Sequence, residues 1–193
     1  MEEIKKVLIV VDMQNDFVTG ALRNEEAIKI VPDVINKVKK AKDNKDTLIV
    51  FTQDTHKENY MKTQEGKNLP IPHCIKGTEG WEIIDELKPF VSSEIRWLPF
   101  EKGTFGSVVL GEELKSFIRT NGVKTEKIEF IGLCTDICVL SNATLVKAFL
   151  PEIPIEVDAT CCAGVTPESH DTALNAMKAI QIRVTGQGEE AWR

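Results

Sequence analysis

Two cysteines lie four positions apart in the stretch GLCTDICV, residues 132–139. Such a pair could be a redox couple, two metal ligands, core packing, or one nucleophile beside an inactive neighbour. A redox couple normally has two residues between its cysteines, and here there are three. Cys138 falls at the start of a predicted helix, where backbone N–H groups and the helix dipole favour a thiolate. It is therefore the candidate nucleophile, although a free cysteine is more often a small core residue.

Charged side chains follow three other predicted strands: Asp12 after the first, Asp54 and His56 after the second, and Lys102 after the third. In parallel sheets, ligands bind beyond the carboxyl ends of the strands, so these residues are expected to converge there. A lysine beside the Cys138 thiol would lower its pKa, and Asp12 could accept and return the thiol proton. Each residue alone would be an ordinary turn or surface residue.

A second set of polar residues lies in QDTHKENYMKTQEGKNLPIPHC, residues 53–74. Asp54 and His56 are separated by one residue, His73 follows later, and Glu65 lies between them. Mixed nitrogen and oxygen ligands of this kind suit Zn, Fe or Mn. On spacing alone, a polar surface loop explains the segment equally well.

Short apolar runs alternate with helical patterns along the chain. The runs predict strands at 6–11, 47–52, 94–98, 127–133, 153–157 and 180–184. The helical spacing predicts helices at 32–44, with Pro32 in the first turn, and at 81–87, 111–120, 136–149 and 167–180. This alternation predicts an α/β fold of three layers, with a mainly parallel sheet and helices on both faces, as one domain over residues 1–193.

Composition excludes several classes of function. Lys and Arg total 24 against 30 Asp and Glu, and this net charge of -6 disfavours nucleic-acid or anionic membrane partners. The N-terminus has only five consecutive apolar residues, too few for a signal peptide, and no run is long enough to span a membrane. We therefore expect a cytoplasmic protein with reduced cysteines.

The remaining residues that could do chemistry have simpler interpretations. Cys74, Cys161 and Cys162 are expected to pack in the core, and His170 is expected to be exposed on its helix. The C-terminal GQGEEAWR, residues 186–193, fits either a free tail or a segment that docks on a partner subunit.

Five motifs occur together in one order: VDMQNDF (11–17), DTH (54–56), PHC (72–74), EKGTFGS (101–107) and GLCTDICV (132–139). This order resembles the isochorismatase-like cysteine hydrolases, and within them the nicotinamidases, over residues 6–184. The resemblance implies a six-stranded sheet of order 3-2-1-4-5-6. It also implies a triad in which Asp12 is the general base, Lys102 lowers the thiol pKa, and Cys138 is the nucleophile.

The resemblance also implies a metal centre and a substrate pocket. Its matching metal ligands are Asp54, His56 and His73, with Glu65 where some members carry a fourth ligand. A cis peptide between Leu133 and Cys134 would aim the N–H groups of Cys134 and Cys138 into an oxyanion hole. The side chains that would line the ring pocket are Phe17 and Phe105.

By the same resemblance, one divalent metal ion, zinc before iron or manganese, would orient nicotinamide for hydrolysis to nicotinate and ammonia, and the protein would form a homo-oligomer. Two departures affect the pocket. Leu69 and Ile71 lie where many nicotinamidases carry an aromatic residue, and Phe105-Gly106-Ser107 replaces a common Tyr-Ser. A related amidohydrolase acting on a carbamoyl compound or ureide is therefore an alternative. A thiol-based redox or metal-storage protein and an inactive binding module are further alternatives.

Overall fold

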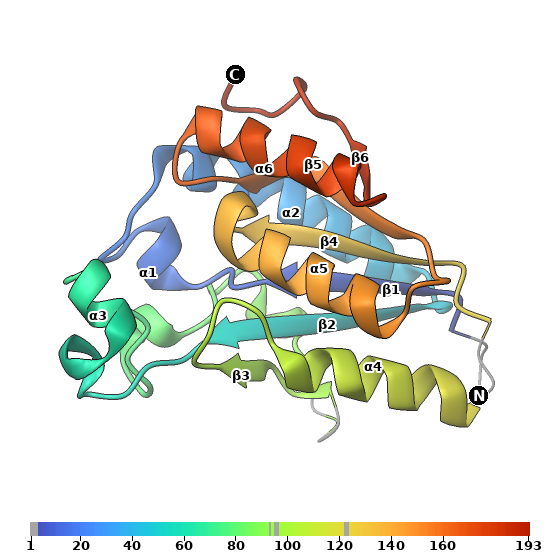
Figure 1. Ribbon diagram of the computed structural model, residues 1–193, viewed down its shortest axis with the longest axis horizontal. Coiled ribbons are helices and arrows are strands. Elements are labelled where there is room, and N and C mark those ends of the chain that lie inside the picture. The colour runs from blue at the N-terminus through green and yellow to red at the C-terminus, as the bar shows by residue number, and fades with distance from the viewer. Residues whose placement is uncertain (1–3, 93, 95–96, 122–123) are drawn as a thin grey trace.

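Six parallel strands form one sheet in the part of the chain that the structure, a computed structural model, describes: residues 4–92, 94, 97–121 and 124–193. The order is β3-β2-β1-β4-β5-β6, which confirms the predicted order. The strands are β1 (Lys6–Val11), β2 (Thr47–Asp54), β3 (Phe100–Lys102), β4 (Lys127–Leu133), β5 (Ile155–Ala163) and β6 (Arg183–Thr185). All carboxyl ends therefore meet at one edge, at the left in Figure 1.

Helices cover both faces of the sheet. They are α1 (Asn15–Val18), α2 (Glu25–Asp43), α3 (Gln64–Asn68), α4 (Val108–Asn121), α5 (Leu140–Phe149) and α6 (Pro167–Ala179). In Figure 1, α4, α5 and α6 lie in front of the sheet and α2 lies behind it, which gives the predicted three layers. The short helices α1 and α3 lie at the end where the strands finish. No helix within the described ranges is long and apolar enough to cross a membrane.

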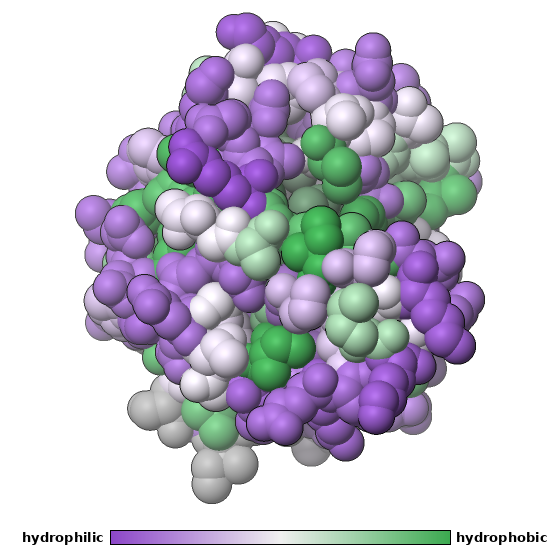
Figure 2. Space-filling view, turned by 90° about the vertical axis from the view of Figure 1, so that its left-hand side faces the viewer, coloured by the Kyte–Doolittle hydropathy of each residue, from purple (hydrophilic) through white to green (hydrophobic). Residues whose placement is uncertain are grey.

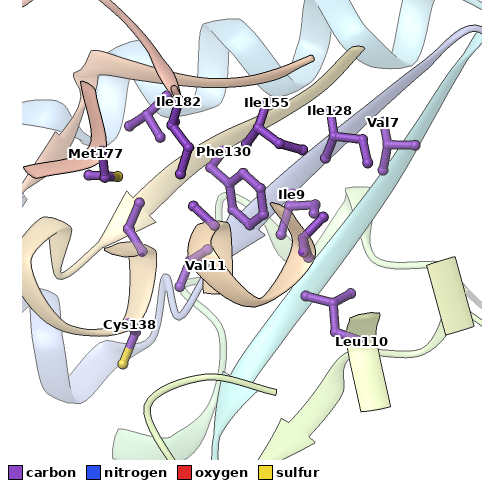
Figure 3. Packing of buried hydrophobic residues seen from close by; sticks show 14 of the residues in the cluster. Val7, Ile9, Val11, Leu110, Ile128, Phe130, Cys138, Ile155, Met177 and Ile182 are labelled. Atoms are coloured by element: carbon purple, nitrogen blue, oxygen red, sulfur yellow. The ribbon is translucent and has the colours of Figure 1, made fainter. Parts of the chain in front are cut away.

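The alternation of side chains along β1 divides the core between the two faces. Val7, Ile9 and Val11 belong to the cluster under α4, α5 and α6, part of which is drawn in Figure 3. Leu8 and Val10 point the other way, into the cluster under α2. Because both faces are covered, β1 is apolar at every position from Val7 onward, as expected for a central parallel strand.

Two elements predicted from the sequence differ in the structure. Residues 81–87 form no α-helix: the backbone of Asn15 donates to the Glu82 carbonyl, and Ile84 donates to Met13, so the segment pairs with the chain after β1. The predicted strand at 94–98 includes residues 95 and 96, which lie outside the described residues, and Trp97 and Leu98 are not in a strand. The third strand is β3, at Phe100–Lys102.

Helix α2 begins earlier than predicted and contains Pro32 in its interior. A proline there removes one backbone hydrogen bond and disfavours the helix. The cost is offset at the helix start, where the side chain of Asn24 accepts from the backbone of Ala27 and donates to the carbonyl of Gly164. An apolar stripe that includes Ala27, Ile30 and Val34 is buried on both sides of Pro32. Capping and packing thus outweigh the local preference.

Candidate active site and metal centre

Asp12, Lys102 and Cys138 meet at the carboxyl ends of β1, β3 and β4. Lys102 Nζ lies 2.6 Å from Asp12 Oδ2 and 3.4 Å from Cys138 Sγ. All three side chains are buried. The structure therefore brings together a carboxylate, an ammonium and a thiol that are 36 to 126 residues apart along the chain.

Backbone constraints at the ends of β1 and β4 place Asp12. Its φ of 47° is in the left-handed region, which Asp tolerates better than most residues, and its Oδ1 accepts a 2.6 Å hydrogen bond from Thr52 Oγ1. Gly132, with φ 111°, lies beside Val11 in the sheet register. A Cβ there would lie 2.2 Å from the Val11 carbonyl oxygen. Glycine thus lets β4 lie close enough to β1 for the Cys138 turn to reach Asp12.

Burial dominates the ionisation of this cluster. Burial, reinforced by the Asp12 carboxylate, raises the pKa of the Cys138 thiol well above its ordinary value. Lys102 lowers the pKa of this thiol, as the sequence predicts, but by less than burial raises it. Burial also raises the pKa of Asp12, against the effect of Lys102. The pKa of Lys102 is raised, since its anionic neighbours outweigh the burial of its ammonium group. Burial and the Asp12 carboxylate therefore oppose formation of the Cys138 thiolate, and Lys102 favours it.

Cys138 belongs to a tight turn at the start of the helix. The turn is a π-helical segment, η5 (Thr135–Val139), and both Ile137 and Val139 donate their N–H groups to the Cys134 carbonyl. Figure 3 shows Cys138 at the edge of the core cluster, with its sulfur directed away from the labelled hydrophobic side chains. No cis peptide occurs among the described residues, so the expected cis bond between Leu133 and Cys134 is wrong.

Asp54, His56 and His73 form a second cluster beside the first. Their ligand atoms all lie within 4.8 Å of one another. His56 donates its backbone N–H to Cys74 and accepts from Lys76, and these bonds hold the PHC segment alongside the end of β2. Glu65, from α3, places Oε1 3.4 Å from His56 Nε2. The predicted ligands therefore converge, and Lys102 links the two clusters at 3.4 Å from Asp54 Oδ1.

The hydrogen bonds of this second cluster fit a bound divalent metal ion. His73 Nδ1 lies 2.8 Å from the Ile71 carbonyl, so it carries the proton and leaves Nε2 as a ligand. His56 Nε2 is buried and makes no hydrogen bond, although Asp54 Oδ2 lies 3.0 Å away. An unpaired buried imidazole nitrogen facing a carboxylate is typical of a cation site.

Two polar residues whose roles could not be predicted from the sequence, Gln14 and Asp16, hold the candidate metal ligands in place. Gln14 Oε1 accepts from the Asp54 N–H at 2.7 Å and Gln14 Nε2 donates to the Asp54 carbonyl at 2.8 Å. Asp16 Oδ2 accepts from the Cys74 N–H at 2.7 Å, next to His73. Both belong to the VDMQNDF motif, but only the fold shows that they bond to other segments.

The two predicted pocket residues have different surroundings. Phe17 is buried, and its ring centroid lies 5.7 Å from that of His73. Phe105 is 47% exposed. Figure 2 shows the end of the molecule where the strands finish, with hydrophobic residues gathered near the middle of a largely hydrophilic face. Phe17 thus borders the metal cluster, whereas Phe105 lies open to solvent.

The remaining cysteines lie where the sequence predicts, but His170 does not. Cys74, Cys161 and Cys162 are free and buried, as predicted. His170, predicted to be exposed, is fully buried and bonds to Thr135 and Glu190. The C-terminal segment that contains Glu190 packs on its own chain.

Comparison with known proteins accounts for this combination of fold and clusters. The isochorismatase domain matches residues 6–189. The chain belongs to the isochorismatase family. Among solved members, the nicotinamidase PncA from Bacillus subtilis is 32% identical, with a TM-score of 0.76, over 93% of this chain and 98% of that one. A pyrazinamidase/nicotinamidase from Streptococcus mutans is 31% identical, with a TM-score of 0.78, over 93% and 99%.

A third member of the isochorismatase family bears on the metal cluster. The pyrazinamidase of Pyrococcus horikoshii, solved in complex with zinc, is 29% identical with a TM-score of 0.73, over 94% of this chain and 98% of that one. The similar structures therefore place this chain in the nicotinamidase branch of the family.

Proposed function

We propose that this protein is a metal-dependent nicotinamidase that hydrolyses nicotinamide to nicotinate and ammonia in NAD salvage. The observation that carries the proposal is Lys102, whose ammonium contacts Asp12, Cys138 and Asp54 and so joins a nucleophile and base to a metal-ligand cluster. Family membership and the nicotinamidases among similar structures support it. The same proposal expects a cytoplasmic homo-oligomer.

In the first half of the reaction, Cys138 acts as the nucleophile and Asp12 as the base. The thiol proton moves to the Asp12 carboxylate while sulfur attacks the amide carbonyl carbon. Lys102 stays charged and stabilises both the carboxylate and the developing thiolate. The C–N bond then breaks, Asp12 returns the proton to the leaving nitrogen, and ammonia departs from a thioester.

In the second half, Asp12 takes a proton from water as the water oxygen attacks the thioester carbonyl. The C–S bond breaks, the acid is released, and the sulfur regains a proton. Backbone N–H groups of Cys134 and Cys138 are proposed to stabilise the oxyanion in both halves. Because burial raises the pKa of the Cys138 thiol, the reaction needs a base beside the sulfur to accept its proton, and Asp12, in contact with Lys102, is placed for that role.

Asp54, His56 and His73, with Glu65, would hold one divalent ion, and we assign zinc first with iron and manganese as alternatives. When bound, the ion supplies a Lewis-acid contact for the pyridine nitrogen and so fixes the orientation of the ring. Phe17 would contact the ring, and Phe105 would cover it from the exposed side.

Ammonia release from four amides tests the proposal: nicotinamide, pyrazinamide, a carbamoyl amino acid and a ureide, each with and without a strong chelator. Nicotinamide turnover that is lost on chelation and restored by zinc is the expected result, and elemental analysis of the purified protein identifies the metal. Turnover of the carbamoyl compound or ureide alone would instead favour the related amidohydrolase. The half-buried Leu69 and the exposed Ile71, in place of an aromatic residue, are the features that favour that alternative.

A further inference from the structure

His170 is buried in α6, and both of its ring nitrogens have partners. Nδ1 lies 2.8 Å from Thr135 Oγ1, and Nε2 lies 3.1 Å from Glu190 Oε1. Thr135 and His170 are 0% exposed and Glu190 is 3% exposed. The three side chains therefore form a continuous, water-excluded chain of hydrogen bonds from the C-terminal segment to the turn that carries Cys138. No step of the proposed reaction uses them.

The chemistry of the partners sets the direction of these hydrogen bonds. A carboxylate can only accept, so His170 Nε2 carries a proton that it donates to Glu190. Burial lowers the pKa of His170, so the ring is neutral and Nδ1 has a lone pair. The Thr135 hydroxyl then donates to Nδ1. Glu190 thus selects the tautomer of His170, and that tautomer fixes the rotamer of Thr135.

The Glu190 end of the chain is held by the segment around it. Its Oε2 accepts from the Gly188 N–H at 3.0 Å and from the Arg193 guanidinium. Arg193 also pairs with Asp171 of α6 at 2.6 Å. The Trp192 ring packs edge-on against His170, with centroids 5.1 Å apart. The acceptor for His170 is therefore fixed in position.

The Thr135 end lies in the same short turn as the nucleophile. Next to Thr135, Asp136 Oδ1 accepts from the Val165 N–H at 3.1 Å, so the turn is attached on this side to the segment between β5 and α6. On its other side, the turn places Cys138 Sγ 3.4 Å from Lys102. Since η5 is a single turn, a shift at Thr135 moves Cys138 relative to Lys102.

We infer that Glu190, His170 and Thr135 form a positioning relay that sets the orientation of the Cys138 turn for amide hydrolysis. The inference rests on the proposed function, because it concerns the nucleophile of that reaction. None of the three touches the reacting atoms, so they act through Cys138 and are positioning residues.

A metal site is a competing interpretation of these side chains, because the ligand atoms of His170, Asp171 and Glu190 lie within 4.8 Å of one another. The contacts speak against it. Both nitrogens of His170 are occupied, and Arg193 already supplies the positive charge between Asp171 and Glu190.

Paired substitutions at each end of the His170 ring test the relay. Thr135→Val removes the hydroxyl and Thr135→Ser keeps it. The amide of His170→Asn reaches the position of Nδ1 and can still accept from Thr135, whereas His170→Gln reaches the position of Nε2 and cannot. Gln187→Ala is the control, because it removes a bond from the C-terminal segment to Asp171 without touching the relay.

For the metal-loaded enzyme, T135V and H170Q should lower kcat about tenfold or more, since small misplacements of a reacting group have effects of this size. KM for nicotinamide and metal content should stay within about twofold, because the metal cluster is untouched. T135S and H170N should recover most of kcat, and Q187A should match the wild type. Wild-type kcat in T135V and H170Q, or equal losses in all five variants, would overturn the relay.

A second readout keeps the relay separate from the proposed function. Alkylation of Cys138 by iodoacetamide, followed by mass spectrometry, needs no substrate. Its rate should differ from the wild type in T135V and H170Q but not in T135S or Q187A. If wild-type protein fails to hydrolyse nicotinamide, the proposed substrate is wrong, yet altered alkylation would still support the relay. Identical alkylation rates in all variants would refute it.

Discussion

Two clusters in this chain combine histidine with carboxylates, and they differ in what lies between their ligand atoms. Asp54, His56 and His73 leave one buried imidazole nitrogen without a hydrogen bond. At the other cluster, His170 has partners on both nitrogens and Arg193 lies against the two carboxylates. Residue type alone does not distinguish the two clusters.

An unused lone pair on a buried imidazole makes Asp54, His56 and His73 the candidate cation site. At Asp54, Lys102 approaches Oδ1 and Oδ2 faces the unpaired His56 nitrogen, whereas Arg193 lies against both Asp171 and Glu190. Sequence can supply the residue types, but the hydrogen bonds that occupy each nitrogen depend on the fold.

The largest expected effect separates the nucleophile from the metal cluster. Cys138→Ala should lower kcat about 10⁵- to 10⁶-fold, as loss of a nucleophile does elsewhere. Metal content should not change, because Cys138 contacts Lys102 and not the ligands. Cys134→Ala is the matched control and should retain turnover, since burial raises the pKa of the Cys134 thiol to about 12 and its proposed role is in the backbone. Retained turnover in Cys138→Ala would refute the triad.

The next prediction tests the difference between the clusters directly. His56→Ala should lower metal affinity at least about 100-fold, since loss of an outer-shell partner alone often costs 10- to 100-fold. KM for nicotinamide should rise with it. His170→Asn should keep full metal content in the same competition titration with a chelator. Metal loss in both variants, or in neither, would contradict the assignment of the metal site to Asp54, His56 and His73.

A smaller effect is expected at the support of the metal cluster. Gln14→Ala removes both side-chain bonds to the Asp54 backbone and leaves buried groups unpaired, which should cost about 2 kcal/mol of unfolding free energy. Metal affinity should fall about tenfold. Urea unfolding and chelator competition measure the two quantities. Unchanged metal affinity would show that Asp54 is placed without Gln14.

The smallest effect is expected at Arg193, whose guanidinium lies against Asp171 and Glu190. Arg193→Ala should lower the unfolding free energy by about 1 kcal/mol at neutral pH, because the guanidinium is partly exposed. Burial raises the pKa of Glu190, but hydrogen bonds from Arg193 and Gly188 outweigh burial and hold that pKa below its usual 4.5. Hydrogen bonds from Gln187 and Arg193 likewise hold the pKa of Asp171 below 3.8.

These pKa shifts determine how that difference depends on pH. A carboxyl whose pKa is depressed by folding contributes stability above its unfolded pKa and loses it as pH falls through the folded value. The difference between wild type and Arg193→Ala should therefore shrink below about pH 4. Thermal melts from pH 7 to pH 3 check this. A constant difference would mean that Arg193 acts through packing alone.

Much of the fold and of the candidate site could be predicted from the sequence. The interiors of the runs at 6–11 and 47–52 are apolar on both faces, which is typical of a buried parallel strand, and this placed Asp12 and Asp54 at strand ends. Because parallel strands end at one edge, residues as distant as Asp12 and Lys102 were expected to meet, and they lie 2.6 Å apart.

What could not be predicted depended on contacts between distant segments. Residues 81–87 have helical spacing, yet backbone bonds to Met13 and Asn15 hold them in another form. Helix α2 runs through Pro32 because Asn24 and the apolar stripe outweigh the local signal. His170 has acidic neighbours along a largely polar helix, yet it lies on the buried face of α6, where Thr135 and the returning C-terminal segment cover it.

Lys102 has one more consequence, because its ammonium lies near the Cys138 sulfur and near Asp54 at once. A metal ion bound beside Asp54 and a negative charge on the Cys138 sulfur would then both change the electrostatic energy of the Lys102 ammonium. Thermodynamic linkage requires such effects to be reciprocal. The factor by which a bound ion favours ionisation of the thiol is the factor by which the ionised thiol tightens the hold on the ion. Binding of the ion and ionisation of the thiol would thus share one coupling free energy, transmitted through the Lys102 side chain.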